Sequence, residues 1–378
     1  MIGFSATNPC HVYDLAVALH KDRALRCYYS GYPAWRLRPP AGFPLVARSW
    51  RTVVTYGLLR MPHRLRPAPS RLFQWQDDGF DRAIANVIGD GNGATLHGLP
   101  GQALLTFQAA RRRGWRTVLN HASGPVRQQL ALLAPEYERA GLRQQDFHRF
   151  DREYFSREEA EYSLADFHCV ASTIVAGQLR DAGVPAARIW VVPYAANPAV
   201  FHPPPDTARR QVNRVIFAGQ LTQRKGLRVL FEAIRQLHQS TPIELHLYGR
   251  TMADIAPDLT TCRDRPWLRL QGPVSQSQLA DAFRAAAILV LPSWEEAFGL
   301  VVPQALNCGL PCIVSNRVGA ADLIASRKNG SIVPVGDPAA LAVEIDWWLR
   351  NPGAFTSPLL TWEQPARRLV ALTQGADS

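Results

Sequence analysis

The chain has 378 residues, of which 47% are hydrophobic, and it carries a formal net charge of +11. This length suits two domains of ordinary size, and no apolar run approaches the roughly 18–20 residues that a membrane-spanning helix needs. The positive charge comes almost entirely from arginine, since Lys21, Lys225 and Lys328 are the only lysines, so composition alone does not indicate a nucleic-acid partner.

The six cysteines are scattered along the chain, and no Cys-x-x-Cys pair occurs. This spacing favours a protein with reduced cysteines and without a structural zinc site. Residues 1–4 lead directly into the polar stretch 5–9, and the pattern shows no secretory signal. We therefore expect a cytoplasmic location.

Alternating patterns of apolar residues predict helices and strands in turn along the first half of the chain. The predicted helices cover residues 9–19, 81–87, 101–113, 152–165 and 173–181, and the predicted strands cover residues 26–29, 95–97, 116–120, 167–172 and 188–193. Ser172 is expected to cap the helix that follows it. The sequence of residues 89–94 matches the consensus of a dinucleotide-binding motif. These residues precede a predicted strand, whereas the motif follows one, so we interpret them as a turn.

The segment from Arg36 to Leu72 contains eight arginines and no acidic residue. Aromatic residues, among them Trp35, Trp50 and Tyr56, are interleaved with these arginines. A basic segment rich in aromatic residues is typical of proteins that bind an anionic membrane surface. The alternative is an ordinary solvated face with loops, and the prolines of the segment exclude one long helix.

The second half opens with a predicted strand at residues 214–219, then a polar loop and a helix that reaches about residue 238. The loop begins at Gly219, and Arg224 and Lys225 stand just before the helix. Lysine supplies a mobile positive charge and arginine a planar fork of donors, and both suit a phosphate group at a helix start. The alternative is an exposed basic loop, but one of only three lysines lies here, which favours a phosphate site.

Further strands are predicted at residues 244–248, 268–274 and 331–333. Ser275 and Gln278 have the spacing of a capping box at the start of a helix. A helix is expected to open at Asp337, and the last predicted element is an amphipathic helix over residues 362–372.

The most informative stretch runs from residue 293 to residue 311, between two short apolar runs that predict buried strands at 287–292 and 312–315. Between the strands lie an acidic loop with Glu296 and a helix over residues 301–308. Glu296 follows the carboxyl end of a strand, where open α/β sheets bind ligands.

The helix in this stretch adds further candidates. Gly299 and Leu300 would present free backbone N–H groups at its start, and such groups suit an anion. Gln304 lies one turn into the helix, on the same rim.

This stretch resembles the acidic signature of the retaining glycosyltransferases of family 4. In that signature a glutamate is followed by a second glutamate after seven residues, around a Phe-Gly pair, and the motif ends in Ala-x-x-x-Gly-x-Pro. Glu296, Phe298 and Gly299 match this pattern, while Gln304 stands where the second glutamate is expected. The resemblance covers residues 165–375 well and the first 90 residues poorly.

The resemblance implies a GT-B fold, an α/β architecture in which two Rossmann-like domains face each other across a cleft. A carboxy-terminal helix would cross back to the first domain. Residues 1–200, with the helix at about 360–378, would form the acceptor-binding domain. Residues 201–359 would form the domain that binds the nucleotide-sugar.

The resemblance also implies roles for individual residues. His121, at the carboxyl end of its strand, and Glu296 are expected to face the donor sugar as catalytic residues; His97 occupies a similar strand end, and a structural role for such a histidine remains open. The residues expected to hold the donor are Gly219, Arg224, Lys225, Gly249, Arg250, Phe298, Gly299, Leu300 and Gln304. Gln304 can accept a hydrogen bond from a ribose hydroxyl, but without charge. Gln220 replaces an arginine that is usual in the diphosphate loop.

The expected function is a retaining glycosyltransferase that moves a sugar from a nucleotide diphospho-sugar to a glycan or glycolipid, as in bacterial polysaccharide or lipopolysaccharide synthesis. No Asp-x-Asp triplet occurs, so we expect neither metal nor cofactor, with Arg224, Lys225 and helix starts neutralising the diphosphate. The alternatives are a sugar-nucleotide epimerase of the same fold and a non-catalytic sugar- or membrane-binding relative. A nucleic-acid partner fits the charge but not the acidic loop.

Overall fold

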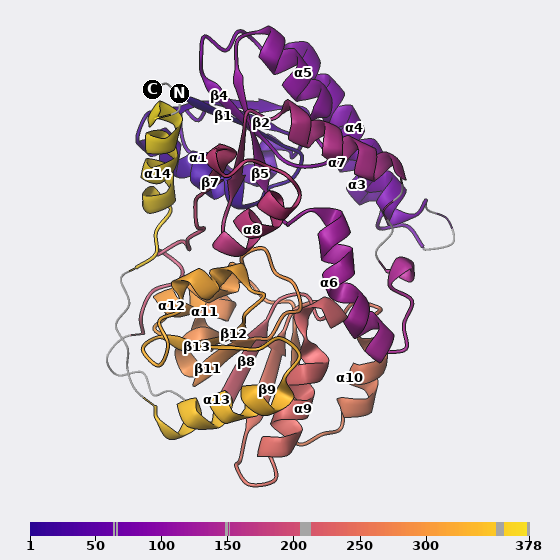
Figure 1. The fold of residues 1–378 in the computed structure, drawn as a ribbon, viewed down its shortest axis with the longest axis vertical. Helices are drawn as coiled ribbons and strands as arrows, with labels where there is room; N and C mark the ends of the chain where they lie inside the picture. Colours follow the sequence, from indigo (N-terminus) through magenta and orange to yellow (C-terminus); the bar gives the residue numbers. More distant parts are fainter. Residues whose placement is uncertain are drawn as a thin grey trace.

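The computed structural model describes residues 1–62, 65, 67–147, 150, 152–204, 213–352 and 359–375. Arg64 and Arg66 of the predicted membrane-binding segment, and residues 376–378 of the predicted closing helix, lie outside these ranges. Within them the chain forms two α/β units that follow each other along the longest axis of the molecule (Figure 1). None of the described helices combines the length and the apolar character that a membrane crossing requires.

The first unit is built on a parallel sheet with the strand order β3-β2-β1-β4-β5-β6-β7 among the described residues. Its strands are β1 (Ile2–Ala6), β2 (Leu25–Ser30), β3 (Leu45–Ala47), β4 (Thr95–Gly98), β5 (Arg116–His121), β6 (Phe167–Val170) and β7 (Ile189–Val191). The helices between them are α1 (His11–Lys21), α2 (Ala34–Leu37), α3 (Trp50–Leu58), α4 (Pro69–Val87), α5 (Leu104–Arg112), α6 (Val126–Arg139), α7 (Arg152–Leu164) and α8 (Thr173–Asp181). Because all strand pairs are parallel, the loops that follow the strands gather at one edge of the sheet.

The second unit is built on a parallel sheet with the order β10-β9-β8-β11-β12-β13, again within the described ranges. Its strands are β8 (Arg214–Ala218), β9 (Glu244–Tyr248), β10 (Leu268–Gly272), β11 (Ile288–Leu291), β12 (Cys312–Ser315) and β13 (Gly330–Val333). The helices are α9 (Leu227–Leu237), α10 (Ala256–Cys262), α11 (Gln276–Ala285), α12 (Val301–Asn307) and α13 (Pro338–Arg350). Residues 215–218 of β8 and all of β11 are buried on both faces of the sheet, which explains their unbroken apolar sequences.

The last helix, α14 (Glu363–Gly375), returns to the first unit and packs beside α1 (Figure 1). Ala366 and Leu369 are fully buried in the same hydrophobic cluster as Val12 and Leu15 of α1. The expected fold, with two Rossmann-like units and a returning helix, is confirmed.

Helix α6 departs from the expected arrangement. It precedes residue 200, yet Leu133 and Tyr137 are buried in the hydrophobic cluster of the second unit. Figure 1 shows the helix extending down the side of that unit. The second core therefore includes a helix that the predicted division at residue 200 gives to the first domain.

Several elements differ from the sequence predictions. Strands β1 and β3 and helices α2, α3 and α10 have no counterpart among the predicted elements. Helix α4 begins at Pro69, twelve residues before the predicted start at residue 81. Proline at the first position of a helix is favourable, because its φ angle is already helical and its missing N–H has no partner to lose.

We expect Leu369→Ala to lower the free energy of unfolding by about 2–5 kcal/mol, because the change leaves a cavity in the core of the first unit. Leu65→Ala is the matched control, because 69% of Leu65 is exposed, and its effect should stay within about 0.5 kcal/mol. Urea unfolding followed by circular dichroism measures both. Equal effects of the two substitutions would show that α14 does not contribute to this core.

Candidate active site

The loops after β8 and β9 are held side by side at the carboxyl edge of the second sheet. The backbone N–H of Gly219 donates to the carbonyl of Tyr248 at 2.9 Å, and that of Leu221 donates to the carbonyl of Arg250 at 2.9 Å. Gly249 has a φ of +143°, and a Cβ there would lie 1.8 Å from the Gly219 carbonyl oxygen. Glycine at 249 is therefore required for this close approach, which brings together three of the residues predicted to hold the donor.

The loop after β8 also contacts the end of β11. A short 3₁₀ helix, η4 (Gln223–Lys225), leads into Gly226, whose φ is +70° and whose Cβ would lie 2.1 Å from the Pro292 carbonyl oxygen. The backbone N–H of Trp294 donates to the carbonyl of Arg224 at 2.9 Å. Two stretches separated by about 70 positions thus meet, and the basic loop lies against the acidic loop.

Four charged side chains converge at this contact, and we call Arg224, Lys225, Glu295 and Glu296 the charge cluster. Lys225 Nζ forms an ion pair with Glu296 Oε2. Arg224 Nη1 lies 3.1 Å from Glu295 Oε2 and 3.7 Å from Glu296 Oε2. Gln129 of α6 donates to Glu295 Oε2 at 2.8 Å. The basic loop and the acidic loop, each predicted to hold part of the donor, thus contact each other, and Glu295 and Gln129 take part in the contact.

The charge cluster is largely removed from water. The side chains of Lys225 and Glu296 are 10% and 15% exposed, and that of Glu295 is 3% exposed. Burial and then the positive charge of Arg224 hold the pKa of Lys225 well below its usual value, while Glu295 opposes them. A buried charge that loses its partner costs about 3–5 kcal/mol. Lys225 therefore needs a negative partner to keep its charge, whether a carboxylate or a ligand.

Glu296 is fixed between two loops by its backbone. Its N–H donates to the carbonyl of Arg317 at 3.1 Å, and its own carbonyl accepts from the N–H of Gly319 at 2.9 Å. Both partners follow β12, the strand next to β11. The position of the Glu296 carboxylate is thus set by two adjacent strand ends instead of by a free loop.

The remaining predicted donor residues differ in their surroundings. Phe298 is buried, and its ring lies 5.1 Å from that of Tyr194. Leu300 is half-buried and packs against the core of the first unit. Gln304 is half-buried, and its side chain has no hydrogen bond within the described part of the chain. Phe298 and Leu300 therefore stabilise the contact between the units, and the predicted contact of Gln304 with a ribose stays a prediction.

His121 lies at the end of β5, but it is only 1% exposed. Its Nε2 lies 3.0 Å from Nδ1 of His168 on β6. Burial and the nearby His168 keep the pKa of His121 well below its usual value. In this structure the ring is a neutral member of the first core, so its catalytic role stays a prediction.

His97 belongs to a second buried network at the same edge of the first sheet. Asn120 Oδ1 lies 3.0 Å from His11 Nε2, and Asn120 Nδ2 lies 3.4 Å from His97 Nδ1. The hydroxyl of Tyr194 lies 2.8 Å from His11 Nε2 and donates to the carbonyl of His121 at 3.2 Å. Because the Tyr194 ring also touches Phe298, this network links the first sheet to the acidic loop.

The start of α8 docks directly on the acidic loop. Ser172 caps α8 as predicted, and its Oγ also donates to the carbonyl of Ala297 at 2.7 Å. Thr173 donates through its N–H and its hydroxyl to Asp322, at 2.8 and 2.6 Å. The sequence identified the cap but gave no sign of this contact between the units.

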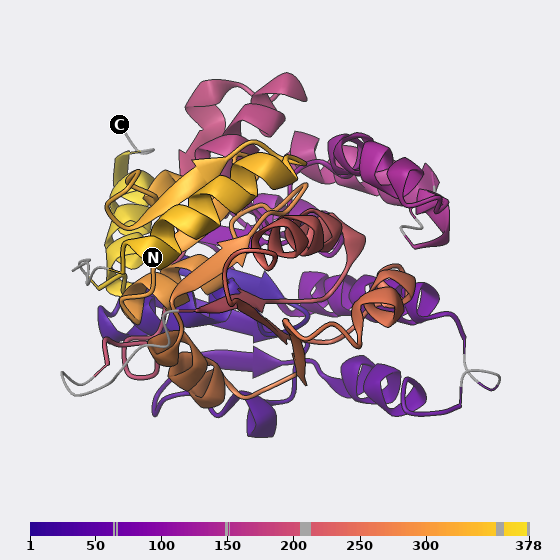
Figure 2. The same ribbon diagram turned by 90° about the horizontal axis from the view of Figure 1, so that it is seen from below.

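A cavity of about 1070 Å³ is lined by residues of both units. Helices α3 and α4, which supply part of this lining, lie on the same side of the molecule as α10 of the second unit (Figures 1 and 2). Gln220, Arg250 and Met252 of the second unit line it on one side. The first unit contributes Tyr32, Pro33, Trp35, Arg36, Thr52, Val53, Tyr56, Gly57, Leu59, Arg60, Pro69 and Phe73. Part of the predicted membrane-binding segment therefore forms a wall of this cavity, opposite two loops of the candidate donor site.

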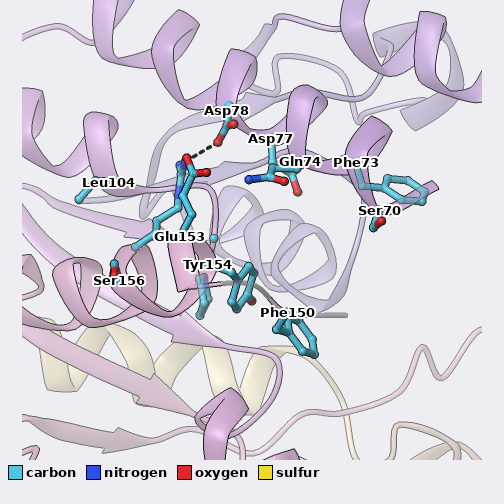
Figure 3. Close-up of a pocket in the computed structure, with 13 residues that line it drawn as sticks. Ser70, Phe73, Gln74, Asp77, Asp78, Leu104, Phe150, Glu153, Tyr154 and Ser156 are labelled. Carbon is cyan, nitrogen blue, oxygen red and sulfur yellow. Dashed lines mark hydrogen bonds and ion pairs between the residues drawn. The ribbon is translucent and has the colours of Figure 1, made fainter. Parts of the chain in front are cut away.

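A second cavity, of about 500 Å³, lies within the first unit and shares Phe73 with the first. Figure 3 shows Gln74, Asp77 and Asp78 of α4 on one side of it, with Phe150 and Tyr154 on the other. Asp77, Asp78 and Glu153 make its lining acidic, and Arg157 is the basic residue among them. Arg157 forms ion pairs with Asp78, Asp81 and Glu161, so its charge is already balanced.

Comparison with known proteins supports the family resemblance. Residues 212–351 match the family described as Glycosyl transferases group 1. The chain is 30% identical over 192 residues to a D-inositol 3-phosphate glycosyltransferase of Xylanimonas cellulosilytica, a match that covers 45% of each chain. The chain thus spans less than half the length of the curated relatives that it matches.

Solved structures resemble the whole chain. Sucrose-phosphate synthase from Thermosynechococcus elongatus has a TM-score of 0.68 at 19% identity, covering 99% of this chain and 94% of that one. Anabaena HepE in complex with UDP has a TM-score of 0.62 at 13% identity, covering 100% and 97%. At these identities the likeness shows the fold, and the GT-B architecture is confirmed.

The buried histidines make the stability of the first unit dependent on pH. Burial lowers the pKa of His97 from 6.5 to about 3, so the folded chain keeps this ring neutral while the unfolded chain protonates it. Its contribution to stability is therefore full above about pH 6.5 and is lost as the pH falls towards 3, by up to about 2 kcal/mol at pH 5.

The comparison of the wild type with His97→Asn tests this dependence, because asparagine keeps an acceptor for Asn120 without a titrating ring. Between about pH 7.5 and about pH 5 the wild type should lose up to about 2 kcal/mol relative to the variant in urea unfolding. Acids such as Glu161, whose pKa is raised to about 7, stabilise the folded chain as the pH falls. Subtracting the stability of the variant from that of the wild type removes this opposite effect, because both proteins contain these acids. His202→Asn, at an exposed histidine, is the control. The prediction for His97 is contradicted if the difference in free energy of unfolding between the wild type and His97→Asn does not change with pH.

Proposed function

We propose, on the premise that residues 212–351 are a glycosyltransferase group 1 domain within a GT-B fold, that the chain transfers a sugar from a nucleotide diphospho-sugar. The charge cluster carries this proposal, because it places two positive charges and a fixed carboxylate at the carboxyl ends of adjacent strands. Such an arrangement suits a ligand with an anionic part and a neutral, polar part.

In the proposed reaction the bond between the anomeric carbon and the diphosphate oxygen breaks. The acceptor hydroxyl oxygen bonds to that carbon, the nucleoside diphosphate leaves with the bonding electrons, and the departing diphosphate oxygen takes the proton of the hydroxyl. Arg224 and Lys225 would stabilise the negative charge that develops on the leaving diphosphate. The family signature around Glu296 supports retention of configuration, with Glu296 next to the donor sugar.

The donor would replace a contact that the structure already contains. Lys225 is paired with Glu296, and a diphosphate carries more negative charge than one carboxylate. When the diphosphate takes over the partnership with Lys225, the Glu296 carboxylate becomes free to accept hydrogen bonds from the sugar hydroxyls. Before the donor binds, this ion pair thus keeps Lys225 charged. It also holds the Glu296 carboxylate where the donor sugar would then bind.

Substitutions at the two members of this ion pair should have different effects on nucleotide affinity and on turnover. Lys225→Met should weaken binding of a nucleoside diphosphate by about 1–3 kcal/mol, which is about five- to 160-fold, because a charge-assisted hydrogen bond is lost. Glu296→Gln should leave that affinity unchanged or improve it, because Lys225 no longer has a competing partner, while turnover collapses. Calorimetry with UDP and GDP and single-turnover rates measure both effects.

All these measurements are made in excess EDTA, since Arg224 and Lys225 are proposed to replace a metal. Lys328→Met and Glu138→Gln, at exposed residues, are the matched controls. If Glu296→Gln loses nucleotide affinity as heavily as Lys225→Met, the assignment of the phosphate and sugar sides is wrong. A loss of turnover in EDTA that magnesium restores would contradict the metal-free mechanism.

We also propose that the chain acts at a membrane surface, on a glycan or lipid-linked acceptor of the kind used in polysaccharide synthesis. Large apolar side chains are exposed on α2, α3 and the residues after them, among them Trp35, Trp50, Val53 and Leu65. Exposed apolar residues next to arginines suit the interface of an anionic bilayer.

Co-sedimentation with lipid vesicles measures this attachment. The chain should pellet with vesicles that contain phosphatidylglycerol at low salt and should be released at high salt, because salt screens the arginine charges. Pelleting to the same extent with neutral phosphatidylcholine vesicles would contradict an electrostatic attachment.

A further inference from the structure

The cavity between the two units has an unbalanced charge. Three arginines line it, Arg36 and Arg60 from the first unit and Arg250 from the second, and no carboxylate is among the lining residues. Within the described part of the chain none of the three forms an ion pair. Three positive charges that share a recess without a counter-charge favour an anion there.

The neighbouring acidic cavity restricts where an anion can bind. It shares Phe73 with the cavity between the units and is lined by Asp77, Asp78 and Glu153, while its one arginine is already held by three carboxylates. A phosphate or carboxylate would be repelled there and attracted to the arginine-lined cavity. The two adjacent cavities thus differ in charge, so a ligand that extends past Phe73 would be oriented by its charged end.

The arginine-lined cavity also suits the uncharged part of a sugar or lipid. Trp35 and Tyr56 are exposed aromatic residues in its lining, and the guanidinium of Arg36 lies 5.0 Å from the ring centre of Trp35. An aromatic ring offers a flat apolar face, and a guanidinium beside it is held ready for a planar two-bond contact with a phosphate or carboxylate.

We propose that this cavity is the acceptor site and that it selects an acceptor bearing a phosphate or carboxylate, held by Arg36 and Arg60. This inference rests on the proposed glycosyltransferase function. The Gln220 and Arg250 loops on the opposite wall connect the cavity to the candidate donor site, so an acceptor there lies next to the donor. The anionic group belongs either to a water-soluble sugar phosphate or to the headgroup of a phospholipid-linked acceptor.

The test measures anion binding with the donor site filled. The full chain is saturated with UDP or GDP, whichever binds, and calorimetry compares glucose 6-phosphate with glucose. Co-sedimentation compares mixed phosphatidylcholine–phosphatidylglycerol vesicles with pure phosphatidylcholine vesicles. The cavity variant is Arg36→Gln with Arg60→Gln, and the matched control is Arg48→Gln with Arg71→Gln, which removes two exposed arginines of the same segment from outside the cavity.

The wild type should bind the anionic probe about tenfold more tightly than its neutral counterpart, and the cavity variant should lose about tenfold, as for charge-assisted hydrogen bonds. The control should change glucose 6-phosphate binding by less than about twofold, and it should lose less vesicle binding than the cavity variant. Loss of glucose 6-phosphate binding in the cavity variant identifies a soluble sugar phosphate. Loss of vesicle binding alone identifies a lipid headgroup. Both results support the proposal.

The inference is overturned if neither anionic probe is preferred over its neutral counterpart, or if the cavity and control variants lose the same affinity. Nucleotide binding is measured on the same samples. It shows whether only the proposed acceptor site is wrong or whether the proposed glycosyltransferase function is wrong as well. Retained UDP or GDP binding with no anion preference rejects the acceptor site alone. Anion binding that depends on Arg36 and Arg60, without any nucleotide binding, keeps the anion site and rejects the glycosyltransferase proposal.

Discussion

The buried ammonium group of Lys225 is the constraint on which the site depends. Its environment lowers its pKa, so the charge persists only beside a negative partner. Glu296 supplies that partner and is itself fixed by backbone hydrogen bonds to the loop after β12. The geometry of three adjacent strand ends, β8, β11 and β12, is therefore tied to one ion pair. A ligand that changes the partner of Lys225 acts on all three loops at once.

The contacts between the two units converge on the same loops. Gln129 of α6 reaches Glu295, and Tyr137 of the same helix donates to Asp254, which also accepts from Thr222 in the loop before η4. From the other side, Ser172 at the start of α8 reaches the carbonyl of Ala297. The first unit therefore contacts both the basic and the acidic loop of the candidate donor site, and a shift between the units would be felt directly by the charge cluster.

The sequence predicted the second unit better than the first for identifiable reasons. The strand, acidic loop, helix and strand around Glu296 carry their own apolar runs and stop signals, so local pattern is sufficient there. Strand β1 contains Gly3 and Ser5, which weaken the apolar pattern, and the proline at position 69 was taken for a breaker although it starts α4. The arginine-lined cavity depends on bringing Arg36 and Arg250 to one cavity, and no local pattern encodes a juxtaposition over more than 200 positions.

The return of α14 to the first unit has a consequence for the order of events during synthesis. The core of the second unit is complete once residue 349 is available, whereas the core of the first unit still lacks Ala366 and Leu369. Domains fold as units while the ribosome elongates the chain. The unit that is translated second therefore has its buried core residues first. The core of the amino-terminal unit remains incomplete until α14 leaves the ribosome.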